Sequence, residues 1–512
     1  MSIRRLFPLL TTIALLLAGC AGATPTATSV PTATNVPTVA PTATVVPAGP
    51  ATAQVLAPLD TLPYPHTACA AGVNLIGQTI NLYHLFDPGD QVPNLTDPVE
   101  AGYADASAYL NAHGGICGAT IGQVLPDPNQ PYDVQAAYAH VAGLTPKPVL
   151  IVLYNSGDGE ALRLQLAKDQ IAALGFRMGS PLALYGDDGK TPGWIFSTNP
   201  LYMDQIGSMC NYVAAHPERY PHPSMGFIAF DDAVTSLITP AAGRDYCAAK
   251  GVGYAGAVTV TGDDFYSVQP MVDKLLKAGA TIIYTNAHLG VPESIGEELV
   301  KLGVQTTVTV AAFNWAFDPA VAVLSQVVDP KSVPPTNGMI GSHTLRSLAE
   351  LDNPGIQLIT RQADANQRAP FLRTDAYVKA WSTTDLFREV YVQTGNRVGY
   401  DHVTGADIKT TLEKIVYAPL AGVERIDYQG GARRALAVNR IGQMGFWGQD
   451  GKTAAGPGNP PMIITNLYVK FFSAFIQPLT DYQPAPDLRP GGADVPAASA
   501  TAGPPATPTK QP

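Results

Sequence analysis

The stretch SVQPMVDKLLKAGATIIYTNAHLGVPESIGEELVKLG, residues 267–303, decides the fold class. Its first part has helical spacing of apolar residues and ends in glycine, which predicts a helix. ATIIYTN then has the β-branched content of a buried strand, and PESIGEELVKLG predicts a second helix. A short apolar strand between two helices is typical of a parallel sheet that helices cover on both faces.

The same alternation extends in both directions along the chain. Around this stretch we expect a helix in NPLYMDQIGSMCNYVAAH and strands in SMGFIAFDD, YAGAVTVTG and TTVTVAAFN. An earlier run starts at residue 73, with strands in VNLIGQTINLYHLF and PVLIVLYN and a helix in DPVEAGYADASAYLNAHGG. GEALRLQLAKDQIAALG is expected to be one helix, and SPLALYG a short strand. The two runs predict two doubly wound, Rossmann-like α/β lobes.

Length and charge limit the classes of function. A chain of 512 residues is too long for one ordinary core, which favours two packed units plus tails. The net charge of −10 argues against a nucleic-acid partner, because phosphate binding needs a basic face. The sequence has no GxSxG, Walker A, HExxH or dinucleotide motif and no zinc-like cysteine spacing. We therefore expect no enzyme activity, no cofactor and no metal site.

The N-terminus has the parts of a secretory signal. Arg4 and Arg5 precede an apolar run, and small residues follow it. A plain cleaved signal and a membrane-anchor helix both fit these features. The sequence LAGC, residues 17–20, resembles the lipobox of bacterial lipoproteins, in which the cysteine is acylated and becomes the first residue of the mature chain. The resemblance implies a lipoprotein signal over residues 1–20 and anchoring to the bacterial cell membrane through Cys20.

Low-complexity segments flank the predicted lobes. Residues 21–68 repeat Pro, Thr, Ala and Val, and the first aromatic residue is Tyr64. Such a segment cannot bury enough apolar surface to offset its ordering entropy, so it is expected to be an extended linker. The tail over residues 484–512 has a similar composition and is predicted to be disordered. The folded part is then residues 69–483.

Several segments, in order, resemble the type I periplasmic substrate-binding proteins, the branched-chain amino-acid-binding group of ABC transporters. YLNAHGGICGATIGQVLPD resembles the family's asparagine and Gly-Gly-Ile stretch with its following strand. VTVTGDDFYSVQPMVDKLLKAGATIIYTNAHLGVPESIGEELVKLG is the closest match, and LRTDAYVKAWSTTDLFREV fits a later helix weakly. The resemblance covers about residues 72–430.

The resemblance implies two lobes joined by a three-stranded hinge. Because the chain crosses between lobes three times, lobe 1 is expected to hold about residues 72–195 and 316–400. Lobe 2 is expected to hold about 196–315 and 401–483. Apart from Cys20 the chain has four cysteines, which allow three pairings. The family topology favours Cys69–Cys117, before neighbouring strands, and Cys210–Cys247, on helices that flank one strand.

In this architecture ligands bind beyond the carboxyl ends of the strands. Asn155 and Ser156 stand where the family has a cleft serine, before a helix N-terminus that can hold an anion. Simple helix capping explains the same residues. Further candidates for ligand contact follow the other strands. For each of them the alternative to a ligand role is a place in a turn, in a solvated loop or in the core. They are Tyr83, Phe86, Tyr185, Gly186, Asp231, Asn286, His288, Asn314 and Trp315.

One residue departs from the amino-acid binders. They carry a glutamate for the ligand ammonium near the position of Asn314, and in this chain Asp318 is the nearest acid. A buried ammonium without a carboxylate is costly, which puts an amino-acid ligand in doubt. The alternative is that Asp187, Asp231 or Asp232 replaces the missing glutamate.

The sequence therefore predicts an extracytoplasmic solute-binding lipoprotein. It would capture a small polar or amino-acid-like ligand between its lobes and deliver it to the permease subunits of an ABC transporter. The alternatives are a ligand sensor for a signalling receptor and, less favoured, a hydrolase with a convergent site.

Overall fold

We analysed a computed structural model of the chain. It describes residues 61–87, 96–127, 132–176, 178–230, 241–260, 267–287, 290–318, 335–369, 372–436, 439–446, 464–466, 469–471 and 474–495. Within these ranges, none of the helices has the length and apolar character needed to cross a bilayer. The predicted signal with Cys20, and the candidates Asp231 and His288, lie outside the described residues.

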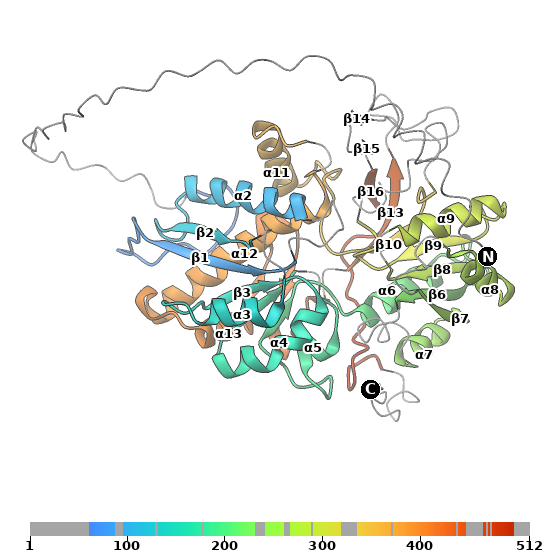
Figure 1. Ribbon diagram of the computed structural model, residues 1–512, viewed down its shortest axis with the longest axis horizontal. Helices are drawn as coiled ribbons and strands as arrows, with labels where there is room; N and C mark the ends of the chain where they lie inside the picture. Colours follow the sequence, from blue (N-terminus) through green and yellow to red (C-terminus); the bar gives the residue numbers. More distant parts are fainter. Residues whose placement is uncertain are drawn as a thin grey trace, which may run out of the picture. The chain divides into compact units, whose positions relative to one another are not determined.

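The first lobe is built on a parallel five-stranded sheet in the order β2-β1-β3-β4-β5 (Figure 1). Its strands are β1 (Thr79–Leu85), β2 (Thr120–Val124), β3 (Leu150–Leu153), β4 (Ala172–Gly175) and β5 (Ile195–Ser197). Because β1 lies between β2 and β3, the strand order reverses there, which is the switch point of a doubly wound sheet.

Helices cover both faces of this sheet. In β3, Leu150 and Val152 pack into one apolar cluster, whereas Ile151 and Leu153 pack into another. Successive strand side chains point to opposite faces, so a strand that is apolar at every position is buried on both. One face packs against α2 (Thr96–Ala112), α12 (Asp375–Val398) and α13 (Gly405–Leu412). The other packs against α3 (Val134–Ala142), α4 (Ser156–Asp169) and α5 (Pro181–Tyr185).

The second lobe has a seven-stranded sheet in the order β16-β13-β10-β9-β8-β6-β7. Five strands are parallel, and β13 pairs antiparallel with both β10 and β16. The strands are β6 (Ser224–Phe230), β7 (Gly253–Val260), β8 (Ile282–Thr285), β9 (Thr309–Ala312), β10 (Ile340–His343), β13 (Arg440–Phe446) and β16 (Ala474–Pro478).

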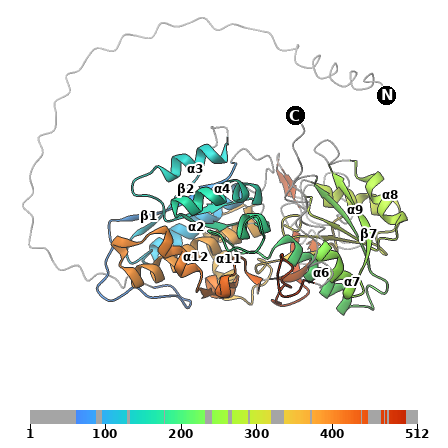
Figure 2. The same cartoon turned by 90° about the horizontal axis from the view of Figure 1, so that it is seen from below.

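Two pairs of helices enclose this second sheet. The helices α6 (Tyr202–Ala215) and α7 (Ala241–Ala249) lie on one side, and α8 (Gln269–Lys277) and α9 (Val291–Lys301) lie on the other (Figure 2). The stretch that decided the fold class from sequence therefore forms α8, β8 and α9, as predicted.

The remaining described elements are short, apart from α11. They are α11 (Pro354–Ala365), α14 (Pro419–Gly422), the 3-10 helices η4 (Tyr400–His402) and η5 (Gln429–Gly431), and the strand pairs β11 (Val416–Tyr417) with β12 (Ile426–Asp427) and β14 (Ile464–Asn466) with β15 (Val469–Phe471). The helices α11 and α14 contribute to the apolar cluster that also holds α12.

The chain passes between the lobes three times before β13, as the resemblance implied, but at different residues. The passages follow β5, follow β10 and precede β13. Since β10 pairs with β9, the first lobe resumes after His343 and not near residue 316. The helix α13 packs on α12 and contributes to the first-lobe core, so residues 401–436 are not part of the second lobe. Both expected boundaries were therefore wrong.

Two expected elements around residue 175 were also wrong. The sequence IAALG, expected to end a helix, contains β4, and SPLALYG is the helix α5. Gln170 takes a left-handed conformation that closes α4, and Ala172–Gly175 then form the strand β4. A run this short has no periodicity to separate a buried strand from the end of a helix.

The predicted linker ends earlier than residue 68. The Tyr64 hydroxyl donates to Asp385 over 2.8 Å, and the Thr67 N–H donates to Glu389 over 2.9 Å. Both carboxylates belong to α12, so this segment is bound to the first lobe. The disulfides Cys69–Cys117 and Cys210–Cys247 are both present, in the pairing that the family topology favoured.

The predicted disordered tail begins too early, because residues 484–495 pack against both lobes (red in Figure 1). The Leu488 N–H donates to Asp204 of α6 over 2.9 Å, and Leu488 joins the apolar cluster of α3, α4 and α5. The Arg489 guanidinium lies 4.6 Å from the centre of the Tyr185 ring in α5. The described C-terminal segment is thus a further connection between the lobes.

The Leu488 side chain is 1% exposed, so its truncation leaves a cavity in the core. Leu488→Ala should therefore destabilise the protein by about 2–5 kcal/mol. The matched control is Leu164→Ala, at a leucine of α4 that is 67% exposed, which should change stability by less than about 0.5 kcal/mol. Urea unfolding measures both. Equal effects of the two substitutions would show that the C-terminal segment contributes nothing to the fold.

Candidate functional site

A small pocket lies where the carboxyl ends of the strands meet the interlobe passages. Its lining comes from the end of β4, from the passages after β5 and β10, from the residues after β9 and from the start of α12. The lining residues are Phe176, Asn199, Asn314, Asp318, His343, Thr344, Leu345, Asp375 and Lys379. Both lobes contribute, which is the arrangement expected of a ligand site in this architecture.

Polar side chains in the pocket are organised by hydrogen bonds across the junction. His343 Nε2 lies 2.7 Å from Asp375 Oδ2, which joins the end of β10 to the first turn of α12. The Thr344 hydroxyl donates to Asn199 Oδ1 over 2.8 Å, linking two of the interlobe passages. Lys379 binds Glu424, which also accepts from Ser382 over 2.7 Å. These contacts fix the lining side chains before any ligand enters.

Several buried polar atoms around this junction have no hydrogen-bond partner among the described residues. They are Thr198 Oγ1, Asn286 Oδ1, Asn314 Oδ1 and His343 Nδ1. Thr198, Asn286 and His343 are each 3% exposed or less. A buried polar atom without a partner costs about 1–3 kcal/mol, and a ligand that bonds to it recovers that cost. Asn286 and Asn314 were both predicted from the sequence as candidates.

An aromatic wall follows the strand ends of the first lobe. The rings of Phe86 and Tyr154 have centroids 4.5 Å apart, and Tyr154 stacks on Phe176 at 4.7 Å. Phe86 was expected in such a wall. Tyr83 was expected there too, but it packs against the cluster of α3, α4 and α5. Tyr83 lies within β1 and Phe86 follows its end, and an odd separation of three residues places extended side chains on opposite faces.

Asn155 and Ser156 use their side chains within the protein. Asn155 caps α4, accepting from the Asp158 N–H and donating to the Asp158 carboxylate, both over 2.8 Å. The Ser156 hydroxyl accepts from the Gly179 N–H over 3.2 Å and lies 3.1 Å from the Tyr202 hydroxyl. The capping alternative is therefore the observed role of Asn155, and Ser156 joins the first lobe to the start of α6.

Tyr185 and Gly186 do not lie at a strand end, because the segment before them is the helix α5. The buried Tyr185 hydroxyl accepts from the Arg433 N–H over 2.8 Å and from Arg434 over 2.6 Å. Gly186 ends α5 with a φ of 70°, a conformation that favours glycine. The loop that does follow β4 begins at Phe176.

The second-lobe candidates near the hinge separate into two groups. Asn314 lines the pocket, whereas Trp315 is half-buried and packs against the second-lobe core. Asp318, the acid nearest to Asn314 in the sequence, lines the same pocket and is 2% exposed. The chain turns after β9, so four residues of sequence separation do not remove the carboxylate from the site.

The sequence reasoning missed Tyr154, Phe176, Asn199, His343, Asp375 and Lys379. Tyr154 directly precedes Asn155, so the rule that selects residues after a strand applied to it as well. His343 ends a four-residue strand, IGSH, that has no clear apolar pattern. Asp375 and Lys379 belong to a helix of the first lobe, and its sequence carries no sign that its N-terminus faces the junction.

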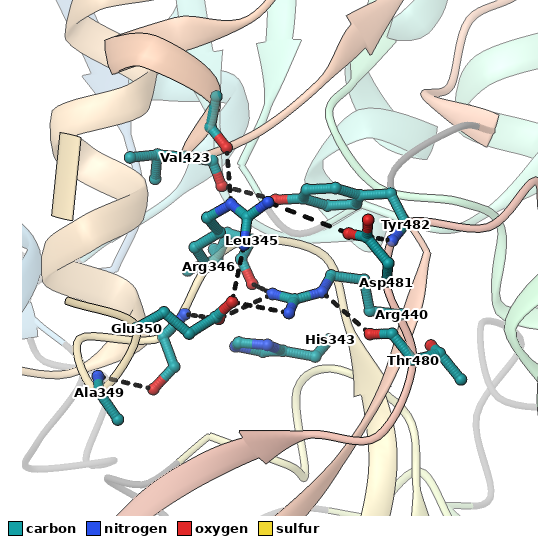
Figure 3. Close-up of polar contacts among 12 residues, drawn as sticks. His343, Leu345, Arg346, Ala349, Glu350, Val423, Arg440, Thr480, Asp481 and Tyr482 are labelled. Atoms are coloured by element: carbon teal, nitrogen blue, oxygen red, sulfur yellow. Dashed lines mark hydrogen bonds and ion pairs between the residues drawn. The ribbon is translucent and has the colours of Figure 1, made fainter. Parts of the chain in front are cut away.

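A second polar network fixes the hinge beside this pocket (Figure 3). Arg440, at the start of β13, binds Glu350 of the first lobe through two contacts of 2.8 Å. Arg346 binds the same carboxylate over 2.9 Å. The Tyr482 hydroxyl donates to the Val423 carbonyl over 2.8 Å, and the Arg440 guanidinium lies 5.1 Å from the Tyr482 ring centre. Three separate segments of chain thus meet at one guanidinium.

The charge of Arg440 changes the acidity of Glu350. Burial by itself would raise the pKa of the Glu350 carboxyl, but the hydrogen bonds and positive charge of Arg440 lower it below its usual value, with help from the Ser347 N–H. The carboxylate is therefore ionised wherever the fold is intact near neutral pH. Across the described residues, no cluster of His, Cys, Asp and Glu side chains could hold a metal ion.

Comparison with known proteins supports the same architecture. The sequence pattern of the family described as "Periplasmic binding protein" matches residues 91–445. A branched-chain amino-acid ABC transporter protein from Thermus thermophilus with bound valine is 13% identical, with a TM-score of 0.62, over 80% of this chain and 97% of that chain. No curated protein sequence matches the chain.

Two further solved structures have the same fold. A substrate-binding protein from Aeropyrum pernix is 16% identical, with a TM-score of 0.60, over 83% of this chain and 100% of that chain. A solute-binding protein from R. palustris in complex with 4-hydroxybenzoate is 14% identical, with a TM-score of 0.58, over 80% of this chain and 98% of that chain. At sequence identities this low, the similarity to these solved structures shows a shared fold and nothing more.

Glu350→Gln should lower the free energy of unfolding at neutral pH by about 3–5 kcal/mol, because it leaves the buried Arg440 guanidinium without its counter-charge. The control Asp364→Asn removes a carboxylate that is 62% exposed and paired with Arg373, and should cost less than about 1 kcal/mol.

The pH dependence of this effect follows from the lowered pKa of Glu350. The carboxylate stabilises the fold above the pKa of an unfolded glutamate, about 4.3, and that stabilisation is lost as the pH falls through the lower folded-state value. The difference in the free energy of unfolding between wild type and Glu350→Gln should therefore become smaller in acid. Chemical unfolding from pH 7 to pH 3 measures it, and a difference that grows in acid would contradict the assignment.

Proposed function

The chain belongs to the periplasmic binding protein family, and we propose that it captures a small solute between its two lobes and delivers it to the permease of an ABC transporter. Membership implies an extracytoplasmic solute-binding protein and not an enzyme. The permease subunits are the proposed partner, and hinge motion of the two lobes would present the closed form to them.

The observation that carries this proposal is a pocket that both lobes line and that contains two buried polar atoms, Asn314 Oδ1 and His343 Nδ1, without a partner among the described residues. Asn314 and His343 come from the second lobe, and Asp375 and Phe176 come from the first. A ligand that bridges the two sets would stabilise one relative position of the lobes.

The chemistry of the site favours a small polar ligand with an apolar part. Phe86, Tyr154 and Phe176 offer ring surface, and the asparagine and histidine atoms offer hydrogen bonds beside it. This mixture is typical of sites for amino-acid-like or aromatic polar molecules. The Thermus thermophilus and R. palustris structures hold valine and 4-hydroxybenzoate, which lie within that range of size.

Tethering by a lipid at Cys20 completes the proposal. The LAGC sequence and the Pro- and Thr-rich segment after it support an acylated N-terminus with a spacer. Attachment would then act on the first lobe, because the segment around Tyr64 and Thr67 is bound to α12.

A thermal-shift screen of the mature chain should find a ligand that raises the melting temperature, because binding to the native state stabilises it by mass action. The panel holds amino acids, amides, amines, aromatic acids, nucleosides and sugars. Phe176→Leu should weaken the response to the hit about tenfold, through loss of ring surface, while Phe230→Leu serves as the matched control at a partly buried ring of the second lobe. The absence of any shift would count against the binding function.

Replacement of the proposed lipid site should release the protein. In a bacterial host, wild-type chain should sediment with membranes and carry an acylated N-terminus by mass spectrometry, whereas Cys20→Ser should lack the modification. Cys210 or Cys247 cannot serve as the acceptor, since they form a disulfide with each other. An unmodified wild-type N-terminus would remove the anchor from the proposal and leave the cleft function intact.

A further inference from the structure

The chain after β16 forms a fourth passage between the lobes. It runs beside the third passage, which precedes β13, and the bridge between Asn439 and Gln483 is antiparallel. The Gln483 N–H donates to the Asn439 carbonyl over 2.8 Å, and the Ala485 N–H donates to the Leu436 carbonyl over 2.9 Å. We call residues 483–490 the C-terminal strap. The family resemblance implied a hinge of three strands, and this strap adds a further one.

The C-terminal strap lies closely against α6 of the second lobe. A β-carbon placed on Gly207 of α6 would lie 2.5 Å from Pro486 Cγ and 2.9 Å from Leu488 Cδ1. Both distances are shorter than carbon atoms tolerate, so only glycine leaves room for the strap at this position of the helix. The disulfide Cys210–Cys247 joins α6 to α7 one helical turn further along, which fixes the surface that the strap contacts.

The same strap also contacts the first lobe. The Leu488 side chain joins the apolar cluster of α3, α4 and α5. The next residue, Arg489, places its guanidinium 4.6 Å from the centre of the Tyr185 ring in α5. A β-carbon on Gly189 would lie 2.8 Å from Pro490 Cγ, so the strap also packs closely on the loop after α5. Neighbouring residues of the strap therefore contact different lobes.

A buried charge adds to the cost of detaching the strap. Asp487 Oδ1 lies 2.5 Å from the Arg434 guanidinium and 3.3 Å from that of Arg489. Arg434 is 1% exposed and also pairs with Asp204 of α6 over 2.7 Å. Removing one partner of a buried ion pair is costly, because the remaining charge stays buried without its counter-charge. Apolar packing and charge thus bind the strap at the same place.

We propose that the C-terminal strap restricts the motion of the hinge. Because it is bound to α6 and to α5 at once, the lobes cannot separate along this side unless the strap leaves one of them. Leaving either lobe exposes apolar surface or removes a partner from Arg434, so the strapped arrangement is favoured. The proposal goes beyond the solute-binding function, because it concerns the ligand-free chain and depends on no ligand.

Distances between spin labels, measured by double electron–electron resonance, test the restriction in the ligand-free protein. Labels on Leu164→Cys and Val300→Cys, at residues 67% and 50% exposed, report on the distance between the lobes. Labels on Leu164→Cys and Val416→Cys, the latter at a residue 61% exposed, report on motion within the first lobe. Cys20→Ser removes the cysteine outside the two disulfides. With the strap intact, the interlobe distribution should be at most about twice as broad as the intralobe one.

Removal of the strap should release the hinge. A chain that ends at Gln483 loses the strap's contacts with α5 and α6, and its interlobe distribution should broaden at least about twofold. A chain that ends at Val495 keeps every contact described above and is the matched control, so its distribution should equal that of the full chain. The intralobe distribution should stay unchanged in both truncated chains.

A point substitution tests the strap with no residue removed. Gly207→Ala places a methyl group against Pro486 and Leu488, so it should displace the strap from α6 and broaden the interlobe distribution. Alanine favours a helix more than glycine does, so this broadening does not reflect a weakened α6. Gly157→Ala in α4 is the matched control, because a β-carbon there would lie no closer than 3.4 Å to a neighbouring atom. It should leave the width unchanged.

The outcomes separate the strap from the solute-binding function. An interlobe distribution of the full chain that is as broad as that of the chain ending at Gln483 would overturn the proposal. If the truncated chain does not fold, Gly207→Ala decides alone, and an unchanged width in that variant would show that the strap does not restrict the hinge. A ligand panel without any hit would count against solute binding and leave the strap unaffected, since no ligand enters these distance measurements.

Discussion

The relative position of the two lobes depends on the buried guanidinium of Arg434. It donates to Asp204 of α6 over 2.7 Å and to the Tyr185 hydroxyl of α5 over 2.6 Å, and it pairs with Asp487 of the C-terminal segment over 2.5 Å. Arg434 is 1% exposed, so its charge is stabilised only by these partners. The three partners belong to the first lobe, the second lobe and the C-terminal segment. Loss of any one partner would leave the buried charge of Arg434 incompletely paired.

The Arg440–Glu350 contact joins the lobes through a different set of segments. Arg440 and Glu350 join β13 to the segment after β10, and Tyr482 packs its ring against the same guanidinium. Charged groups buried in this way do more for the choice of one geometry than for net stability, since desolvation offsets much of their attraction. Arg440 also donates to the carbonyl of Leu345, which lines the candidate pocket, so this contact between the lobes bears directly on the pocket.

Much of the architecture could be predicted from local sequence. Strands such as LIVL and IIYT are short apolar or β-branched runs that are buried throughout, and helices such as α8 and α9 have clear amphipathic spacing, so the two doubly wound lobes followed from pattern alone. The pattern failed at β4, where four apolar residues after α4 have no period of their own. It failed again at residues 61–68 and 484–495, whose composition resembles a linker but whose few large side chains, Tyr64 and Leu488, find places in the core.

The sequence by itself determined the fold class, the disulfide candidates and the rule that ligand-binding residues follow the strands. Phe86, Asn286 and Asn314 do follow the ends of β1, β8 and β9, and their role in ligand binding stays a prediction. Only the tertiary structure decided that Tyr83 and Tyr185 face elsewhere and that His343, Asp375 and Asp318 share one pocket. The physical reason is that these three come from β10, α12 and the turn after β9, and their proximity depends on how the interlobe passages fold, which no local periodicity records.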